Sequence, residues 1–240
     1  MKKIISTSVC SNCHTYNMCF VGELPCDAQS TIEQIITQRV RLKRGANLAV
    51  QGDEVTALYL IKSGDLKRSV LTIDGYEQVT GFRHAGDVVG LDGWLKKKQP
   101  SNATILNDTE VCVLSISEIR RLGTILNGVN THLIERMQND ISELNQLLAE
   151  INSKHAIERL GTFFLTQSEK QKKIGFSPTH LRLPMTRIEM GNNLGLKVET
   201  VSRNLKQLEL LGIIKIDRRN ILIQNIKALK NFQDKSLMDA

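Results

Sequence analysis

Three cysteines near the start of the chain have the residue type and the spacing of a metal or redox site. Cys10, Cys13 and Cys19 follow the pattern Cys-x2-Cys-x5-Cys. Soft thiolates in a CxxC pair bind zinc or iron–sulfur clusters, and both kinds of site take about four protein ligands. The three thiols can wrap a loop around one group of this kind. A fourth ligand must then come from elsewhere in the chain.

Two other cysteines are candidates for the fourth ligand. Cys26 is closer in the sequence, whereas Cys112 lies in the apolar run 111–114, where a small buried core residue is the ordinary alternative. Spacing alone rates the two about equally. Because five cysteines are an odd number in a chain of 240 residues, they favour thiolate ligation or scattered buried thiols over a disulfide framework.

The C-terminal third carries a second motif, which is typical of a helix-turn-helix. Thr186 and Glu189 have the spacing of a capping box, so a helix is expected to begin there. It is expected to run to about Leu194, where Gly195 supplies the left-handed turn that the motif needs. Gly191 is small at a point where two helices must approach each other closely. An ordinary capped helical hairpin with solvated charges is the alternative.

A second helix is expected to begin at Val198 or Glu199. Three of its apolar residues would face inward: Val201, Leu205 and Leu208. Its outer N-terminal turns, which meet base edges when such a helix enters the major groove, then carry Glu199, Ser202 and Arg203. Arginine pairs with guanine, glutamate accepts from cytosine and serine adapts to several bases. The expected DNA-binding residues of this motif and its wing are Lys197, Glu199, Thr200, Ser202, Arg203 and Arg218.

The charge distribution and a predicted hairpin also favour DNA as the partner. Residues 154–240 carry 16 lysines and arginines against 8 aspartates and glutamates, whereas residues 1–153 carry 16 against 17. A localised basic excess attracts the phosphate backbone, although a solvated basic face is the ordinary alternative. Two β-branched runs, 213–216 and 221–223, flank residues 217–220 and predict a hairpin wing whose arginines clamp phosphate.

The elements that would position these residues fall into distinct regions. From about residue 38 to 115, short apolar or alternating runs separated by glycines predict a β-barrel or jelly roll. After Ser117 the pattern becomes helical, and apolar residues recur at spacings of three and four, as in a coiled-coil seam. Flanking acids favour a partly exposed helix that pairs with its copy in a homodimer, and packing against the chain's own β domain is the alternative. The seam residues are Ile134, Met137, Ile141, Leu144, Leu148 and Ile151.

From about residue 10 to 225, the chain resembles the CRP/FNR family of bacterial transcription regulators, and in particular its oxygen-responsive iron–sulfur branch. The segments that carry the resemblance are CSNCHTYNMC, EVCVL, QGDEVTALYLIKSGDLK, GYEQVTGF, HAGDVVGLDG, ERLGTFF, GFSP and MTRIEMGNNLGLKVETVSR. The resemblance implies an α+β fold. Its parts are an N-terminal cyclic-nucleotide-binding-like β jelly roll, a long coiled-coil dimerisation helix and a C-terminal winged helix-turn-helix.

The same resemblance implies a cofactor and a mechanism. It assigns a [4Fe-4S] cluster to Cys10, Cys13, Cys19 and Cys112, and it leaves Cys26 as a spare thiol. An intact cluster favours the homodimer that binds DNA, and oxygen converts the cluster and loosens the dimer.

The resemblance also implies partners. Relatives with the helix face VETxSR read two-fold DNA sites with TTGAT-type half-sites. The resemblance therefore implies the same base-reading role for the matching residues Glu199, Ser202 and Arg203. The loop TIDGYEQ around Gly75 and other surfaces of the barrel are expected to touch RNA polymerase.

Two features depart from the pattern of the relatives. The cyclic-nucleotide branch has an arginine–serine pair for the ligand phosphate, and the corresponding stretch 99–103 has no arginine, so no cyclic nucleotide is expected. The oxygen-gated branch has an acidic residue in the middle of the dimerisation helix, where this chain has Leu144. A buried acid opposes association by desolvation and like-charge repulsion. Its absence predicts looser gating of the dimer.

A zinc-stabilised or nitric-oxide-responsive regulator of the same scaffold is the second hypothesis. An enzyme is not expected, because the five histidines form no acid–base or metal pattern and no GxSxG or phosphate-loop motif occurs. With no apolar run long enough for a membrane span or a signal peptide, the expected location is the cytoplasm, away from membranes. The expected domains are a cysteine-rich segment (1–19), a jelly-roll sensor (20–116), a dimerisation region (117–152) and a DNA-binding domain (153–240).

Overall fold

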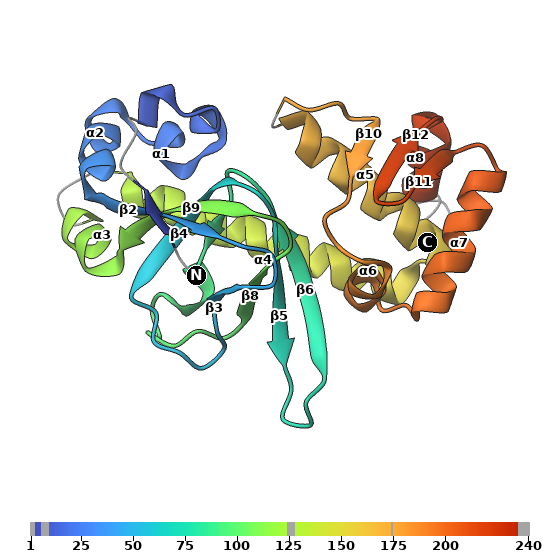
Figure 1. Cartoon of the computed structure of the whole chain (residues 1–240), viewed down its shortest axis with the longest axis horizontal. Coiled ribbons are helices and arrows are strands. Elements are labelled where there is room, and N and C mark those ends of the chain that lie inside the picture. Colours follow the sequence, from blue (N-terminus) through green and yellow to red (C-terminus); the bar gives the residue numbers. More distant parts are fainter. Residues whose placement is uncertain (1–2, 6–9, 124–127, 174, 235–240) are drawn as a thin grey trace. The chain divides into compact units, whose positions relative to one another are not determined.

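The computed structural model describes residues 3–5, 10–123, 128–173 and 175–234 (Figure 1). The chain divides into two compact units, Met1–Ser142 and Glu143–Ala240. The α+β fold class is confirmed, with a β sandwich, a long helix and a helix-turn-helix followed by a wing. The division into four domains stays a prediction, and its first and last parts extend beyond the described residues. No helix within these ranges is long and apolar enough to span a membrane.

The N-terminal unit is built around two antiparallel sheets with the strand orders β1-β2-β9-β4-β7 and β3-β8-β5-β6. The first sheet consists of β1 (Lys3–Ile5), β2 (Ile36–Leu42), β9 (Thr109–Ser115), β4 (Ala57–Ser63) and β7 (Val88–Val89). The second sheet consists of β3 (Asn47–Ala49), β8 (Asn102–Ile105), β5 (Leu66–Leu71) and β6 (Glu77–Arg83). All of these strands except β1 fall in or at the edge of the region, about 38–115, where the glycine-punctuated sequence predicted a jelly roll.

Side chains of β4 and β9 alternate between two apolar clusters, because successive residues of a strand point to opposite faces. Ile61 and Val111 pack into a cluster that includes Leu66 from the second sheet. Leu60 and Cys112 point to the other face and belong to a cluster that includes the N-terminal helices. The alternation therefore places Cys112 on the side of the sheet where the first cysteines lie.

Short helical segments cover that outer face of the first sheet (Figure 1). They are η1 (Cys10–Asn12), η2 (Tyr16–Met18), α1 (Phe20–Glu23) and α2 (Cys26–Ile35). A further short turn, η3 (Leu91–Gly93), follows β7. Phe20, Val21, Ala28 and Ile32 are almost fully buried against the sheet. Burial of these apolar side chains stabilises the packing of the N-terminal segment on the sheet.

Helix α3 (Ile116–Gly123) is followed by the long helix α4 (Val129–Ser153), which agrees with the helical pattern expected after Ser117. Val129 and Leu133 are buried in the same cluster as Cys112, and Met137 packs against it. The first turns of α4 thus contact the chain's own β domain. Four seam residues are exposed in the single chain: Ile134, Ile141, Leu144 and Leu148. Ile151 is half-buried.

Ion pairs hold the middle of α4 to the second sheet. The carboxylate of Asp140 lies 3.1 Å from the guanidinium of Arg68 on β5 and 2.9 Å from that of Arg83 on β6. Arg68 also pairs with Asp92 at 2.6 Å. Because these side chains are mostly buried, the pairs restrict how α4 can turn about its axis.

The C-terminal unit packs helices on a small antiparallel sheet of strand order β10-β12-β11. The strands are β10 (His180–Arg182), β11 (Ile214–Asp217) and β12 (Asn220–Ile223). The helices are α5 (Ala156–Lys173), α6 (Arg187–Leu194), α7 (Val198–Leu210) and α8 (Ile226–Asp234). Leu160 and Phe164 of α5 are fully buried and supply much of the core of this unit.

Candidate functional sites

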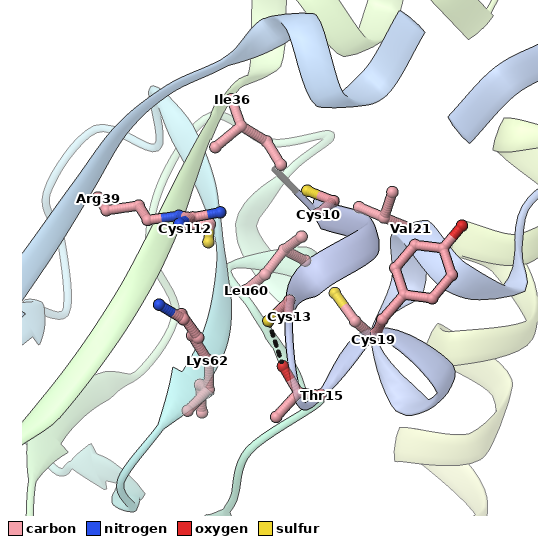
Figure 2. A pocket seen from close by; sticks show the side chains of 12 residues that line it. Cys10, Cys13, Thr15, Cys19, Val21, Ile36, Arg39, Leu60, Lys62 and Cys112 are labelled. Atoms are coloured by element: carbon pink, nitrogen blue, oxygen red, sulfur yellow. Dashed lines mark hydrogen bonds between the residues drawn. The ribbon is translucent and has the colours of Figure 1, made fainter. Parts of the chain in front are cut away.

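Four of the five cysteines line a single cavity between the N-terminal loop and the first sheet. Figure 2 shows Cys10, Cys13 and Cys19 on the loop and Cys112 on β9. Apolar side chains, among them Leu60, complete the wall. Residues far apart in the sequence are therefore brought to one place by the strand register and by the path of the loop.

Cys26 lies apart from this group. It is exposed at the start of α2 and does not line the cavity. As the side chains lie, no three histidine, cysteine, aspartate or glutamate residues in the described part of the chain are close enough together to hold a metal ion. The four sulfur atoms are thus arranged around a cavity and do not converge on one point.

Backbone hydrogen bonds fold the cysteine loop into tight turns. The amide of Cys13 donates to the carbonyl of Cys10 at 2.8 Å, and the amide of Cys19 donates to the carbonyl of Thr15 at 2.9 Å. The side chain of Thr15 is buried, and its hydroxyl lies 3.2 Å from the Cys13 sulfur. These turns point the cysteine side chains toward the cavity (Figure 2).

Gly22 permits the close return of the loop onto α1. A Cβ atom at this position would lie 1.9 Å from the carbonyl oxygen of Tyr16, which is far inside van der Waals contact. The amide of Gly22 donates to the carbonyl of Cys19 at 2.9 Å. Sequence reasoning missed Gly22, although a glycine three residues after the last clustered cysteine is a usable signal.

Helix α2 fastens the loop from its other side. The carboxylate of Glu33 accepts a hydrogen bond from the amide of Cys10 at 2.6 Å. The side chain of Gln29 accepts from the Tyr16 hydroxyl and donates to the carbonyl of Leu24 at 2.7 Å. The polar face of α2 therefore determines where the first cysteine lies.

Burial disfavours the thiolate form of three of the cavity cysteines, Cys10, Cys19 and Cys112. It raises the pKa of Cys10 to about 11, with Glu33 and Cys112 adding to the rise. It also raises the pKa of Cys19 to about 12, although a hydrogen bond from the Val21 amide acts to lower that pKa. Burial raises the pKa of Cys112, while the nearby Arg39 acts to lower it. Such thiols stay protonated at neutral pH unless a metal cation binds, because coordination deprotonates a thiol.

Two basic side chains also line the cavity. Arg39 of β2 lies opposite Cys112 in the strand register, and Lys62 comes from β4 (Figure 2). The ammonium group of Lys62 pairs with the Glu110 carboxylate at 2.7 Å, and the same carboxylate pairs with the guanidinium of Arg41 at 3.0 Å. Sequence reasoning missed both basic residues, because a charged residue in a strand gives no sign of whether it is buried.

The expected capping box opens α6. The amide of Glu189 donates to the Thr186 hydroxyl at 3.2 Å, and the amide of Thr186 donates to the Glu189 carboxylate at 2.8 Å. Gly195 ends the helix with a left-handed φ of 65°. A Cβ atom on Gly191 would lie 2.6 Å from the carbonyl oxygen of Leu196, so the turn between the helices needs glycine there. These local features confirm the predicted helix-turn-helix geometry.

Helix α7 begins at Val198 and presents its polar residues as expected. The inward residues are buried: Val201, Leu205 and Leu208. Glu199 and Arg203 are exposed, and Ser202 is half-buried, with its hydroxyl 3.3 Å from the guanidinium of Arg187 on α6. Thr200 is half-buried and Lys197 is exposed just before the helix. Arg187 is a neighbour of this surface that sequence reasoning did not single out.

Strands β11 and β12 form the predicted wing. Asp217 pairs with Asn220, which leaves Arg218 and Arg219 as the turn. Arg218 is exposed and adopts a left-handed φ of 54°. Arg219 instead donates to the carbonyl of Pro184 at 3.3 Å. The contact of Arg218 with a DNA phosphate stays a prediction.

Comparison with known proteins places this architecture in a family. Residues 39–124 match the cyclic nucleotide-binding domain, and residues 158–232 match the Crp-like helix-turn-helix domain. The transcriptional regulatory protein btr of Bordetella pertussis is 34% identical over 221 residues, which cover 92% of this chain and 91% of that protein. The chain belongs to the CRP/FNR family of transcription regulators. As a CRP/FNR regulator it is a DNA-binding protein and not an enzyme, as the sequence predicted.

One further relative and one solved structure support this CRP/FNR assignment. The fumarate and nitrate reduction regulatory protein of Escherichia coli (strain K12) is 33% identical over 220 residues, covering 92% of this chain and 88% of that protein. The structure of FixK2 from Bradyrhizobium japonicum superimposes with a TM-score of 0.73 at 25% identity, covering 81% of this chain and 96% of FixK2.

The match to a cyclic nucleotide-binding domain concerns the fold of the sandwich. In the stretch 99–103, which corresponds to the phosphate-binding segment of the cyclic-nucleotide branch, the hydroxyl of Ser101 donates to the carboxylate of Asp92 at 2.8 Å. Asp92 in turn pairs with Arg68. That no cyclic nucleotide binds this CRP/FNR regulator stays a prediction.

Proposed function

We propose that the chain is an oxygen-responsive, sequence-specific transcription regulator whose sensor is a [4Fe-4S] cluster held by Cys10, Cys13, Cys19 and Cys112. The observation that carries this proposal is the cavity lined by these four cysteines, from which Cys26 is absent. The similarity to the fumarate and nitrate reduction regulatory proteins supports it.

The donor set suits an iron–sulfur cluster. Four thiolates are the usual ligands of a [4Fe-4S] cluster, and a cavity ringed by sulfur atoms suits a group of several atoms. When bound, the cluster supplies an oxygen-sensitive redox centre. The chain's own contribution is to hold the sulfur atoms, with the loop turns fixing three of them and β9 fixing Cys112. The buried apolar wall limits access of water.

Packing offers a route from the cysteines to the dimerisation helix. Cys10 and Cys112 belong to the same apolar cluster as Val129 and Leu133 of α4. Regulators of this family bind DNA and act as dimers. We infer that the homodimer forms along the exposed seam of α4, so that movement of the cysteine loop alters the support of this helix.

The DNA-reading role is proposed for the outer face of α7 and for the wing. Glu199, Ser202 and Arg203 would meet the bases of two-fold TTGAT-type sites. The flanking contacts proposed for the backbone or for adjacent bases are Lys197, Thr200 and Arg218. The exposure of Lys197, Glu199, Arg203 and Arg218 and the basic excess of this part of the chain support the assignment.

The proposed contact with RNA polymerase lies on the hairpin between β5 and β6. Ile73 and Tyr76 at its turn are exposed, which supports a contact surface there. A location in the cytoplasm is proposed together with this role.

Anaerobic purification tests the cofactor. We expect a brown protein whose iron and sulfide contents match a four-iron cluster and whose spectrum bleaches in air. A colourless protein with stoichiometric zinc would favour the zinc-stabilised alternative. A cluster that is stable in air but reacts with nitric oxide would support a nitric-oxide sensor on the same scaffold.

A further inference from the structure

Arg39 is the feature of the cysteine cavity that the proposed ligands do not explain. Only 2% of its surface is exposed, and arginine is almost never buried to this extent unless it has a partner. Its guanidinium lies beside the sulfur of Cys112 (Figure 2). The strand register places Arg39 directly across from Cys112, so this contact follows from the pairing of β2 with β9.

The other charged groups around the cavity differ from Arg39 in what they contact. Lys62 already has a counter-ion outside the set of cysteines, because its ammonium group pairs with the Glu110 carboxylate at 2.7 Å. Glu33 lies beside Cys10, where its carboxylate accepts the backbone amide. Because a guanidinium stays protonated in proteins, Arg39 brings a fixed positive charge to the cavity.

A cluster held by four thiolates is a net anion, because the thiolate charges exceed the positive charge of the iron–sulfur core. We infer that Arg39 is the counter-cation of the ligated cysteines, a positioning residue that stabilises the Cys112 thiolate and tunes the reduction potential of the bound cluster. This inference rests on the proposed function. The reduction potential of a cluster depends on the charges around it, and Arg39 places a positive charge beside one of the ligand sulfur atoms.

The direction of the effect follows from electrostatics. One-electron reduction adds one negative charge to the cluster and breaks no bond to the protein. A nearby fixed positive charge stabilises the reduced form more than the oxidised form. Removal of the Arg39 charge therefore shifts the potential to more negative values, and it also weakens retention of the cluster because the Cys112 thiolate loses its partner.

The test uses the full chain, purified without oxygen, in four forms: wild type, Arg39→Gln, Arg39→Lys and Arg41→Gln. Arg41 is a matched control, since it lies on the same strand but has an exposed side chain. Iron and sulfide contents, loss of iron to a chelator and a dithionite titration of the potential are measured. We expect Arg39→Gln to lose iron several-fold faster and to have a more negative potential. Arg39→Lys should recover part of both effects, and Arg41→Gln should match the wild type.

Equal potentials and equal iron loss in Arg39→Gln and wild type would overturn the inference. If Arg39→Gln fails to fold, as judged by circular dichroism, Arg39→Met removes the charge without burying a new polar group, and its potential decides the question in the same way. A wild-type protein without iron and sulfide would instead contradict the proposed function, before any variant is compared.

Discussion

Arg136 of α4 donates to the carbonyl oxygen of Met18 at 3.1 Å, one residue before Cys19. The same guanidinium pairs with Glu23 of α1 at 2.6 Å. One side chain thus joins the cysteine loop to the helix whose exposed seam is proposed to dimerise. A change in the loop acts on α4 directly through this contact, as well as through the apolar cluster beneath it.

Replacement of Arg136 should weaken the coupling between the cluster and the dimer. We expect Arg136→Gln to retain the cluster but to show a smaller difference in dimer fraction between the cluster-bearing and air-oxidised protein. Because the Arg136–Glu23 pair is partly exposed, the cost in unfolding free energy should stay under about 1 kcal/mol. Sedimentation of both states measures the effect, with Arg121→Gln, which breaks an exposed pair on α3, as the control. An unchanged difference in dimer fraction would show that Arg136 does not couple the two.

Alanine at Gly22 should disrupt the loop that carries the cysteines. The added Cβ would meet the Tyr16 carbonyl oxygen at 1.9 Å, so the loop must move away from α1. We expect Gly22→Ala to bind several-fold less iron and sulfide, while its C-terminal unit still binds non-specific DNA. Gly81→Ala, where the nearest atom is the Arg83 guanidinium at 3.4 Å, serves as the glycine control. Normal iron content in Gly22→Ala would mean that the close contact is not needed for the site.

Substitutions in the DNA-binding unit should separate base reading from backbone contact. We expect Arg203→Ala to weaken specific binding by roughly 1–3 kcal/mol and to relax the choice at one base, as for a bidentate guanine contact. The wing carries Arg218 at its turn and Lys215, an exposed residue of β11. Arg218→Ala and Lys215→Ala should weaken binding about equally on all sequences, since phosphate contacts carry no base information. Binding is measured on a two-fold site and on random DNA at fixed salt. Equal losses on both DNAs for Arg203→Ala would exclude a base-reading role.

An acid in the dimerisation seam should favour monomers. Leu144 is 39% exposed in the single chain, and its neighbours along the seam are exposed too. Leu144→Asp would bring two carboxylates together near the axis of the helix pair, where burial and like charge oppose association. We expect the wild type to keep some dimer after air oxidation, and Leu144→Asp to dimerise only with the cluster. Sedimentation that finds a wholly monomeric oxidised wild type, or an equally dimeric variant, would contradict this view of the seam.

Signals local in the sequence predicted the helix-turn-helix and the long helix well. The capping box at Thr186, the turn at Gly195 and the spacing of the seam residues each depend on neighbours within a few positions. The choice between Cys26 and Cys112 does not depend on neighbours in the sequence, because it is decided by which face of β9 meets the N-terminal loop. The resemblance to a family favoured Cys112, which lines the cavity with the three loop cysteines, and its role as a ligand stays a prediction.

Contacts between distant residues could not be found from the sequence. Arg39 stands in a run of alternating residues, and nothing in that run shows that its charge faces a cysteine on β9. Arg136 and Met18 are 118 positions apart, so no periodicity relates them. Met137 was assigned to the seam but packs partly against its own β domain, since α4 begins inside that core. Tertiary packing decides all three cases.

The iron content of single cysteine variants tests the proposed sensor most directly. Each of Cys10, Cys13, Cys19 and Cys112 is replaced by serine, and Cys26→Ser is the matched control because that thiol is exposed outside the cavity. Iron and sulfide are assayed after anaerobic purification. We expect Cys112→Ser to lose most of its iron and Cys26→Ser to keep the wild-type amount. Iron retained in Cys112→Ser and lost in Cys26→Ser would reverse the ligand assignment and contradict the proposed site.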